Sequence, residues 1–257
     1  RFPDRYALSD TGVQAAEWLK LQVETIAKNA GRSDLSVRFV KTGSSYKQPS
    51  VVATIAGTEP GAEGVVIGGH MDTLSNNKPG ADDDGSGSVT VLETARVILN
   101  SGMKFKRPLH FVWYAAEEQG LVGSQYVVSD FVAQKIPVRG VLQLDMTGYQ
   151  YQNDERMWIM DDYVDESLSK FVNDLIVKYV GAPIGHSKCG YACSDHASWN
   201  RKGFKAAMPF EAQMNLDNPN IHTRDDTREG MSLSHMVKFS KLAIAFATEL
   251  AEPVATK

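Results

Sequence analysis

The sequence predicts an α/β protein built as a three-layer α/β/α sandwich, with a mostly parallel, mixed β-sheet between two layers of helices. Two observations lead to this prediction. Short apolar runs such as "GVVIGGH" (residues 64–70) are continuous rather than alternating, which is typical of strands buried on both faces. These runs alternate along the chain with stretches that have the apolar spacing of amphipathic helices, and this alternation favours a parallel sheet covered by helices.

The first predicted helix spans residues 9–31. Ser9 is a suitable N-terminal capping residue and Gly31 a suitable terminator. Between them, apolar residues recur at the spacing of one helix face, and these are Ala15, Leu19, Val23 and Ile26. Two strands are expected next, over residues 35–42 and 50–57, because both stretches are rich in β-branched residues.

The remaining elements follow the same two patterns. Further buried strands are predicted at residues 64–70, 108–118, 138–146 and 205–211. Further helices are predicted at about residues 85–100, 123–135, 165–180 and 232–250, the last with Ser232 or Ser234 as its cap. No internal repeat, long linker or low-complexity segment separates these elements, so we expect a single domain over residues 1–257.

The composition excludes several classes of protein. With 257 residues, of which 42% are apolar, the chain is long enough to bury roughly three quarters of its unfolded surface. Its formal net charge of −4 lacks the basic excess that is typical of nucleic-acid binding. No apolar run approaches the roughly 20 residues that cross a bilayer. We therefore expect no nucleic-acid or membrane partner, and a monomer, because no large exposed apolar stripe is evident.

Polar residues follow the apolar runs where the predicted strands end. They are His70 and Asp72 in "GGHMDT", Asp82, Asp83 and Asp84 in "GADDDGSG", Glu117 and Glu118 in "YAAEEQG", Asp145 in "LQLDMT", and His222 in "NIHTRDD". The strands of a parallel sheet end at one edge, where ligand sites form. Histidine together with carboxylates suits Zn²⁺, whereas Mg²⁺ and Ca²⁺ prefer oxygen ligands. Each residue alone has an ordinary explanation, such as a helix cap for the aspartate run, but together they indicate one metal centre.

The adjacent glutamates Glu117 and Glu118 raise a separate question. Neighbouring side chains in a strand point to opposite faces, so the two carboxylates either both lie in solvent or have two different roles. The pattern by itself leaves both possibilities open.

Six motifs occur in the order and at the spacing of a known family. They are "GGHMD", "GADDDGSG", "YAAEEQGLVGS", "LQLDMT", "CGYACSDHASW" and "IHT". From about residue 65 to the last helix, the sequence resembles the secreted bacterial leucyl aminopeptidases, which are two-zinc exopeptidases. The resemblance implies a zinc-peptidase-like fold and hydrolysis of the N-terminal bond of peptides that have a free N-terminus and, preferably, a large apolar first residue such as Leu.

The resemblance also implies a set of metal ligands. These are His70 and Asp145 for one Zn²⁺, Glu118 and His222 for a second Zn²⁺, and Asp83 as the carboxylate that bridges the two ions. A bridging ligand suits a pair of metal ions about 3.5–4 Å apart. Asp72 would accept a hydrogen bond from the His70 ring and so fix its tautomer.

The implied catalytic residues are Glu117 and Tyr191. In the family pattern Glu117 is the general base, which takes a proton from the zinc-activated water and passes it to the leaving amine. Tyr191 resembles the tyrosine that donates a hydrogen bond to the developing oxyanion. The adjacent glutamates would thus divide two roles, with Glu118 binding metal and Glu117 carrying a proton.

By the same resemblance, an apolar pocket would receive the first side chain of the substrate. Its lining would be Met146, Cys189, Tyr191, Cys193, Met208, Phe210, Met214 and Ile221. Ordinary core packing is the alternative for Met208 and Phe210. The sequence departs from the family pattern at Met214 and Asp217, where aromatic residues are usual. Arg224, beside "IHT", favours a carboxypeptidase or dipeptidase on the same two-metal site as the alternative activity.

Cys189 and Cys193 in "HSKCGYACSDH" allow three interpretations. With His186 and His196 they could form a Cys₂His₂ zinc site, although this set is more compact than two ligand pairs usually are. Both thiols could instead be free and buried. The resemblance favours a disulfide, which implies an oxidising compartment and export. The chain begins without a signal-like leader, so we expect any signal segment to be absent from this form.

Three other classes fit the sequence poorly. The stretch "DDDGSGSVT" has Thr90 in place of the third glycine of a dinucleotide-binding loop, and its aspartates would repel a pyrophosphate. No G-x-S-x-G motif is present for a serine hydrolase. The third class is a catalytically inactive binding domain on the same fold. Such domains usually lose metal ligands, whereas this chain keeps every candidate ligand and Glu117.

Overall fold

A six-stranded β-sheet lies at the centre of the computed structural model, which describes residues 2–255 and leaves residues 1 and 256–257 of the predicted domain outside it. The strand order is β1-β2-β4-β3-β5-β8. Strand β3 runs parallel to β4 and β5, and β5 runs parallel to β8, whereas β1 and β2 form an antiparallel edge beside β4. The strands are β1 (Leu35–Val40), β2 (Ser50–Ile55), β3 (Gly64–His70), β4 (Leu109–Tyr114), β5 (Val138–Gln143) and β8 (Ala206–Ala207). The predicted mixed, mostly parallel sheet is confirmed.

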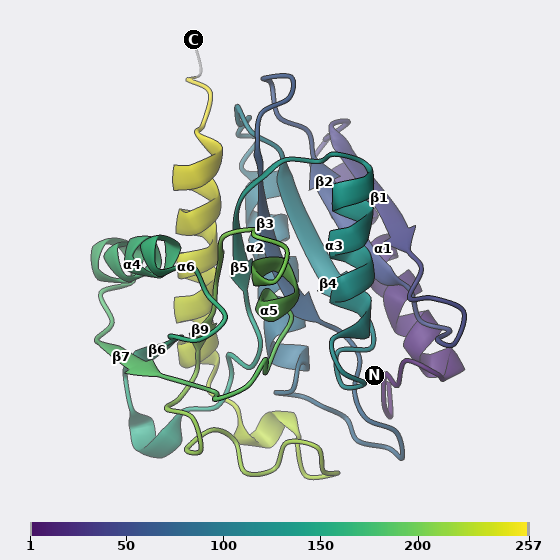
Figure 1. Ribbon diagram of the computed structural model, residues 1–257, viewed down its shortest axis with the longest axis vertical. Helices are drawn as coiled ribbons and strands as arrows, with labels where there is room; N and C mark the ends of the chain where they lie inside the picture. The colour runs from purple at the N-terminus through teal and green to yellow at the C-terminus, as the bar shows by residue number, and fades with distance from the viewer. Residues whose placement is uncertain (1, 256–257) are drawn as a thin grey trace.

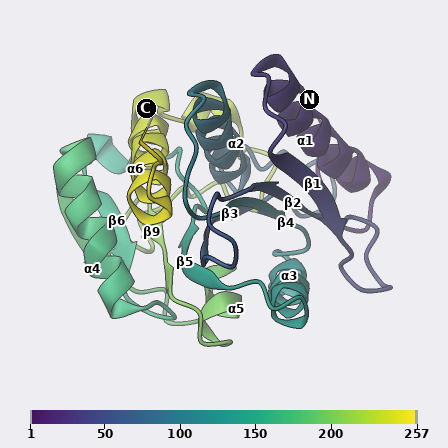
Figure 2. The same ribbon diagram turned by 90° about the horizontal axis from the view of Figure 1, so that it is seen from above.

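Helices cover both faces of this sheet (Figure 1). Figure 2 shows α1, α2, α6 and α4 on one side of the sheet and α3 and α5 on the other. The helices are α1 (Asp10–Asn29), α2 (Gly85–Asn100), α3 (Val122–Ala133), α4 (Glu166–Leu175), α5 (His196–Asn200) and α6 (Leu233–Ala251). The predicted three-layer α/β/α sandwich is therefore confirmed.

The two faces of the central strands pack against different helices, which explains why these strands are apolar throughout. In β4, Phe111 and Trp113 belong to the core beneath α1, α2 and α6. Val112 and Tyr114 point to the opposite face of the sheet and belong to the core beneath α3 and α5. All four side chains are fully buried. Burial on both faces removes the alternation that a half-exposed strand would show.

Two predicted strands end earlier than the sequence suggested. The stretch predicted over residues 108–118 is a strand only as far as Tyr114, and the stretch over residues 138–146 only as far as Gln143. Beyond β4 the backbone turns, with a left-handed conformation at Ala116. The polar residues that follow these strands therefore lie in turns, where the pattern of apolar residues no longer indicates the backbone conformation.

A second, three-stranded sheet was not predicted. Its order is β7-β6-β9, with β6 parallel to β7 and antiparallel to β9. Its strands are β6 (Met157–Met160), β7 (Ile184–Ser187) and β9 (Pro209–Phe210). The single strand predicted over residues 205–211 is wrong, because Met208 separates β8 in the large sheet from β9 in the small one. Strands this short are too brief to show a period in the sequence.

The helix caps agree with the prediction at two positions. The Ser9 hydroxyl accepts a hydrogen bond from the N–H of Gly12 at the start of α1, and the Ser232 hydroxyl accepts one from the N–H of His235 at the start of α6.

The helix predicted over residues 165–180 is divided into α4 and a π-helical segment. The short helical segments are η1 (Tyr151–Asn153), η2 (Ile176–Val180) and η3 (Arg228–Gly230). Within residues 2–255, no helix has the length and apolar character to cross a membrane.

Gly87, in the first turn of α2, lets this helix approach the sheet closely. A Cβ atom at this position would lie 2.1 Å from the carbonyl oxygen of Leu144 and 2.3 Å from Oδ1 of Asp84. Because the backbone at Leu144, directly after β5, cannot move aside freely, we expect Gly87→Ala to destabilise the fold by about 1–3 kcal/mol, as overpacking does. Calorimetric unfolding would show this as a lower midpoint. Gly230→Ala is the matched control, because its Cβ would meet nothing within 4 Å, and equal midpoints for the two variants would contradict this account.

Candidate metal centre

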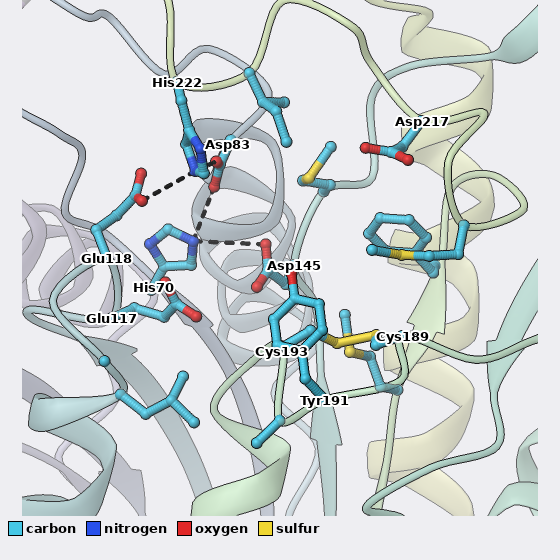
Figure 3. Close-up of a pocket in the computed structure, with 18 residues that line it drawn as sticks. His70, Asp83, Glu117, Glu118, Asp145, Cys189, Tyr191, Cys193, Asp217 and His222 are labelled. Carbon is cyan, nitrogen blue, oxygen red and sulfur yellow. Dashed lines mark hydrogen bonds and ion pairs between the residues drawn. A yellow bond between two sulfur atoms is a disulfide. The ribbon is translucent and has the colours of Figure 1, made fainter.

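The polar residues that follow the strands lie together at the carboxyl edge of the parallel strands (Figure 3). His70 is the last residue of β3, the glutamate pair follows β4, and Asp145 follows β5. Asp83 comes from the turn before α2, and His222 comes from the long loop between β9 and α6. Five segments that are far apart in the sequence thus contribute to one cavity of about 370 Å³.

Two groups of possible metal ligands share one carboxylate. One group is His70, Asp83 and Asp145, the other is Asp83, Glu118 and His222, and within each group the ligand atoms lie within 4.8 Å of one another. His70 Nε2 lies 3.0 Å from Asp83 Oδ1 and 3.5 Å from Asp145 Oδ1. His222 Nε2 lies 3.0 Å from both Asp83 Oδ2 and Glu118 Oε2. The two oxygens of Asp83 therefore face different histidines, as the oxygens of a bridging ligand would.

The charges of these groups influence one another strongly. Burial opposes a charge on the His70 ring, but Asp145 and Glu117 outweigh burial and raise the pKa of His70 well above its usual value. Hydrogen bonds with Asp83 and Glu118 raise the pKa of His222 to about 10. The carboxylates outnumber the two histidines, so the cavity attracts positive charge.

Glu117 and Glu118 lie in the turn after β4, and Asp72 holds this turn. The Asp72 carboxylate accepts hydrogen bonds from the backbone N–H of Glu117 (3.0 Å) and of Glu118 (3.3 Å). The two glutamate side chains then diverge: Glu118 reaches His222, whereas the Glu117 carboxylate lies on the other side of the His70 ring (Figure 3). Burial raises the pKa of both glutamate carboxyls. The two glutamate side chains thus point apart because they lie in a turn, and not because they alternate along a strand.

Asp72 also contacts the His70 ring. His70 Nδ1 lies 3.2 Å from the backbone carbonyl oxygen of Asp72 and 3.5 Å from its carboxylate Oδ1. Both oxygens lie beside Nδ1, and the carbonyl is the nearer acceptor. With Nδ1 bonded in this way, Nε2 faces the other ligand atoms.

Asp84 joins three elements around the site. As the cap of α2, its Oδ1 accepts a hydrogen bond from the N–H of Gly87 (2.8 Å) and also from that of Met146 (3.0 Å). Its Oδ2 accepts a hydrogen bond from the N–H of His70 (3.0 Å). The side chain is fully buried, and the peptide bond between Asp83 and Asp84 is cis. The helix-cap interpretation of the aspartate run therefore holds for Asp84, whereas Asp83 faces the histidines.

Asp226 holds the loop of His222 against the turn of Asp83. Its carboxylate accepts hydrogen bonds from the backbone N–H of Asp82 (3.0 Å) and of Asp83 (3.1 Å), and it is 1% exposed. The ligand group around His222 is thus held together by hydrogen bonds between two loops. The sequence did not indicate this role, because nothing in "HTRDD" separates buried Asp226 from its exposed neighbour Asp225.

The rest of the cavity has an apolar wall. All the residues predicted for the substrate pocket line it, and they are Met146, Cys189, Tyr191, Cys193, Met208, Phe210, Met214 and Ile221. Cys189 and Cys193 form a disulfide, which excludes the Cys₂His₂ and free-thiol interpretations. Tyr191 is 58% exposed on the same loop, so its hydroxyl is open to a bound molecule. Lining residues absent from the predicted set are Gly120, Leu121, Ala192 and Asp217.

The four remaining histidines belong to neither ligand group. His110 is buried within β4 and His235 within α6. His186 is exposed in β7, and His196 is buried at the start of α5. One polar contact of the site was not expected: Ser194, just after the disulfide, donates a hydrogen bond to Oδ2 of Asp145.

Comparison with known proteins identifies the family of this site. The model of peptidase family M28 matches residues 50–247. The chain belongs to peptidase family M28. It is therefore an enzyme that hydrolyses peptide bonds, and the family predicted from the six motifs is confirmed.

The M28 peptidase has similar proteins in both fungi and bacteria. Leucine aminopeptidase 1 of Trichophyton equinum is 40% identical over 266 residues, which cover 98% of this chain and 71% of the relative. The structure of Legionella pneumophila LapA aminopeptidase superposes with a TM-score of 0.95 and 52% identity, covering 99% of this chain and 68% of that one. The aminopeptidase from Aneurinibacillus sp. strain AM-1 superposes with a TM-score of 0.69 and 26% identity over 80% of this chain and 49% of its own. The fold that the chain shares with these solved structures thus agrees with its match to peptidase family M28.

Removal of the Asp226 carboxylate should loosen the contact between the two ligand loops. Asp226→Ala leaves the buried N–H groups of Asp82 and Asp83 without an acceptor, and each unpaired group costs about 1–3 kcal/mol. We expect an unfolding midpoint several degrees lower, because each kcal/mol shifts the midpoint of a chain of this size by about 2–4 °C. Asp225→Ala removes an exposed aspartate next to it and serves as the control. A midpoint for Asp226→Ala equal to that of the control would contradict the role given to Asp226.

Proposed function

We propose that this M28 peptidase is an aminopeptidase that binds two Zn²⁺ ions per chain. The observation that carries the proposal is the position of Asp83, whose two oxygens lie 3.0 Å from two different histidines inside the cavity. The names of the relatives, leucine aminopeptidases and LapA aminopeptidase, support this reaction.

The ligand atoms fit zinc. Each group combines one imidazole nitrogen with carboxylate oxygens, a donor set that zinc accepts and that harder cations prefer less. His70, Asp83 and Asp145 would hold one ion, and Asp83, Glu118 and His222 the other. Bound zinc would supply a Lewis acid that polarises the scissile carbonyl and lowers the pKa of a water molecule.

Glu117 is the residue best placed to move the proton. It belongs to neither ligand group, and its carboxylate lies on the cavity side of the glutamate turn (Figure 3). Burial raises the pKa of its carboxyl well above the usual value, which makes this carboxylate a stronger base than an exposed glutamate. Glu117 would take the proton of the attacking water and then give it to the leaving amine.

Tyr191 would stabilise the charge that develops on the carbonyl oxygen. Its hydroxyl lines the cavity, and burial, followed by the charges of Glu117 and Asp145, raises its pKa above the usual value. The hydroxyl therefore keeps its proton and can donate a hydrogen bond to the oxyanion.

The substrate would enter with its free amine toward the carboxylates and its first side chain against the apolar wall. Met146, Met208 and Met214 give that wall a flexible shape, which suits Leu, Met and Phe with modest discrimination between them. A carboxypeptidase or dipeptidase would need a cation for the substrate carboxylate. Arg224 does not supply one, because it is not among the described residues that line the cavity and its guanidinium donates to the carbonyl of Asn76.

We also propose that the protein is exported. The disulfide between Cys189 and Cys193 supports this, because disulfides persist in oxidising compartments outside the cytosol.

Metal removal and replacement test the two-zinc proposal. Protein dialysed against a chelator should not hydrolyse L-leucine p-nitroanilide, and activity should return as the second equivalent of zinc binds. Full activity with one equivalent of zinc bound would contradict the proposal that Asp83 is a ligand of two ions. Absence of activity at full zinc occupancy would contradict the aminopeptidase reaction and would favour a carboxypeptidase, a dipeptidase or an inactive binding domain.

The two glutamates should respond differently to substitution. Glu117→Gln should keep both zinc ions and lower kcat by about 10²–10⁴-fold, which is the contribution of a general base. Glu118→Gln, the matched control, should instead weaken zinc binding, because Glu118 lies 3.0 Å from His222 Nε2 in one ligand group. Zinc content and kcat measured together separate the two effects. A Glu117→Gln enzyme that kept most of its kcat would show that the proton is carried by another group.

A further inference from the structure

Asp217 is an acidic residue on the wall of the cavity that the reaction does not use. Among the described residues that line the cavity, the other charged or titratable groups are the candidate zinc ligands, Glu117 and Tyr191. Asp217 lies on the side of the cavity opposite Glu118, and its carboxylate is turned toward the cavity (Figure 3). The apolar wall of the same cavity includes Met214, Phe210 and Ile221. Asp217 therefore adds a carboxylate to this cavity that is separate from both candidate ligand groups.

The carboxylate of Asp217 is available to a ligand. Its Oδ1 accepts one hydrogen bond, from the backbone N–H of Asn215 at 2.9 Å. Within residues 2–255 it has no ion-pair partner within 4 Å, and the side chain is half-buried. One oxygen is therefore tied to the local turn, and the other is left for water or for a molecule in the cavity.

The negative charge of Asp217 acts on a group inside the cavity. The pKa of Tyr191 is raised first by burial and then by Glu117, Asp145 and Asp217 together. A cation that entered the cavity would thus meet the attraction of Asp217 at a point separate from the zinc ligands.

We propose that Asp217 extends the substrate range of the enzyme to peptides with a lysine or arginine at the N-terminus. This inference rests on the proposed aminopeptidase function. Lysine and arginine have an apolar stem and a charged head, and such side chains place the stem on apolar surface while the head reaches a polar group. The methionine-lined wall would hold the stem, and the Asp217 carboxylate would accept a hydrogen bond from the ammonium or guanidinium group.

Leucine and lysine would thus be accepted by different parts of one cavity. A leucine side chain ends within the apolar wall and leaves Asp217 to water. A lysine side chain carries its ammonium farther from the backbone than the end of a leucine side chain, and its charge-assisted hydrogen bond to Asp217 would be roughly twice as strong as a neutral one. An N-terminal glutamate would be disfavoured by the same carboxylate, since two like charges would meet in a half-buried space.

The test compares substrates that differ in the charged head. With the zinc-loaded enzyme, kcat/KM is measured for the p-nitroanilides of L-lysine, L-arginine, L-norleucine and L-leucine, because norleucine resembles the lysine stem without its charge. Asp217→Asn should lower the lysine-to-norleucine ratio of kcat/KM by about tenfold, because the ammonium group would then meet a neutral amide oxygen instead of a carboxylate. Asp217→Glu, which keeps the carboxylate, should keep most of that ratio.

Asp225→Asn is the matched control, because it removes the same charge from an exposed residue of the same loop that does not line the cavity. Its lysine-to-norleucine ratio should equal that of the wild type. Added salt should lower the wild-type ratio and leave the Asp217→Asn ratio unchanged, because salt screens the pairing of charges.

Two outcomes would overturn the inference. One is an unchanged ratio in Asp217→Asn, and the other is a wild-type enzyme that cleaves leucine and norleucine but not lysine or arginine. In both cases the aminopeptidase function would stand. Absence of hydrolysis of all four substrates at full zinc occupancy would instead overturn the proposed function, and the substrate inference with it.

Discussion

The burial of many carboxylates at one edge of the sheet is the constraint on which the rest of the site depends. A buried carboxylate is costly unless hydrogen bonds or opposite charges compensate for its lost hydration. Three of these carboxylates, on Asp72, Asp84 and Asp226, are compensated by backbone N–H groups of the surrounding turns. Asp83 and Glu118 instead face the two histidines. The outer carboxylates therefore fix the loops, and the inner ones are left for cations.

Positive charge from the N-terminal segment stabilises the same edge. The guanidinium of Arg5 donates hydrogen bonds to the carbonyls of Met71, Pro79 and Gly80, in the loop between β3 and α2. Burial lowers the pKa of Arg5, and the nearby carboxylates of Asp84 and Asp72 act in the opposite direction. The segment before α1 thus carries the permanent cation that balances this acidic edge, and it links the first residues of the fold to the loop that supplies Asp83.

The cavity combines two kinds of surface because two sheets contribute to it. The large sheet and its following turns provide the polar end, with His70 and Asp145. The small sheet and the disulfide loop provide the apolar wall, where Met208 and Phe210 are at once core residues and lining residues. These two residues therefore belong both to the core and to the lining of the cavity, which Asp217 also lines, whereas their contact with a substrate stays a prediction.

The α/β/α sandwich, the family and the polar residues at the strand ends could be predicted from the sequence, because burial on both faces leaves continuous apolar runs and the motifs are local. The sequence by itself did not determine how those residues are held. The short strands β6, β7 and β9 have no detectable period, and the roles of Asp226 and Asp84 depend on backbone N–H groups of distant segments. The sequence predicts a strand through Glu117 and Glu118, but these residues form a turn whose backbone is held by Asp72, far away in the chain. Long-range hydrogen bonds of buried carboxylates leave no local pattern, so only the tertiary structure decides them.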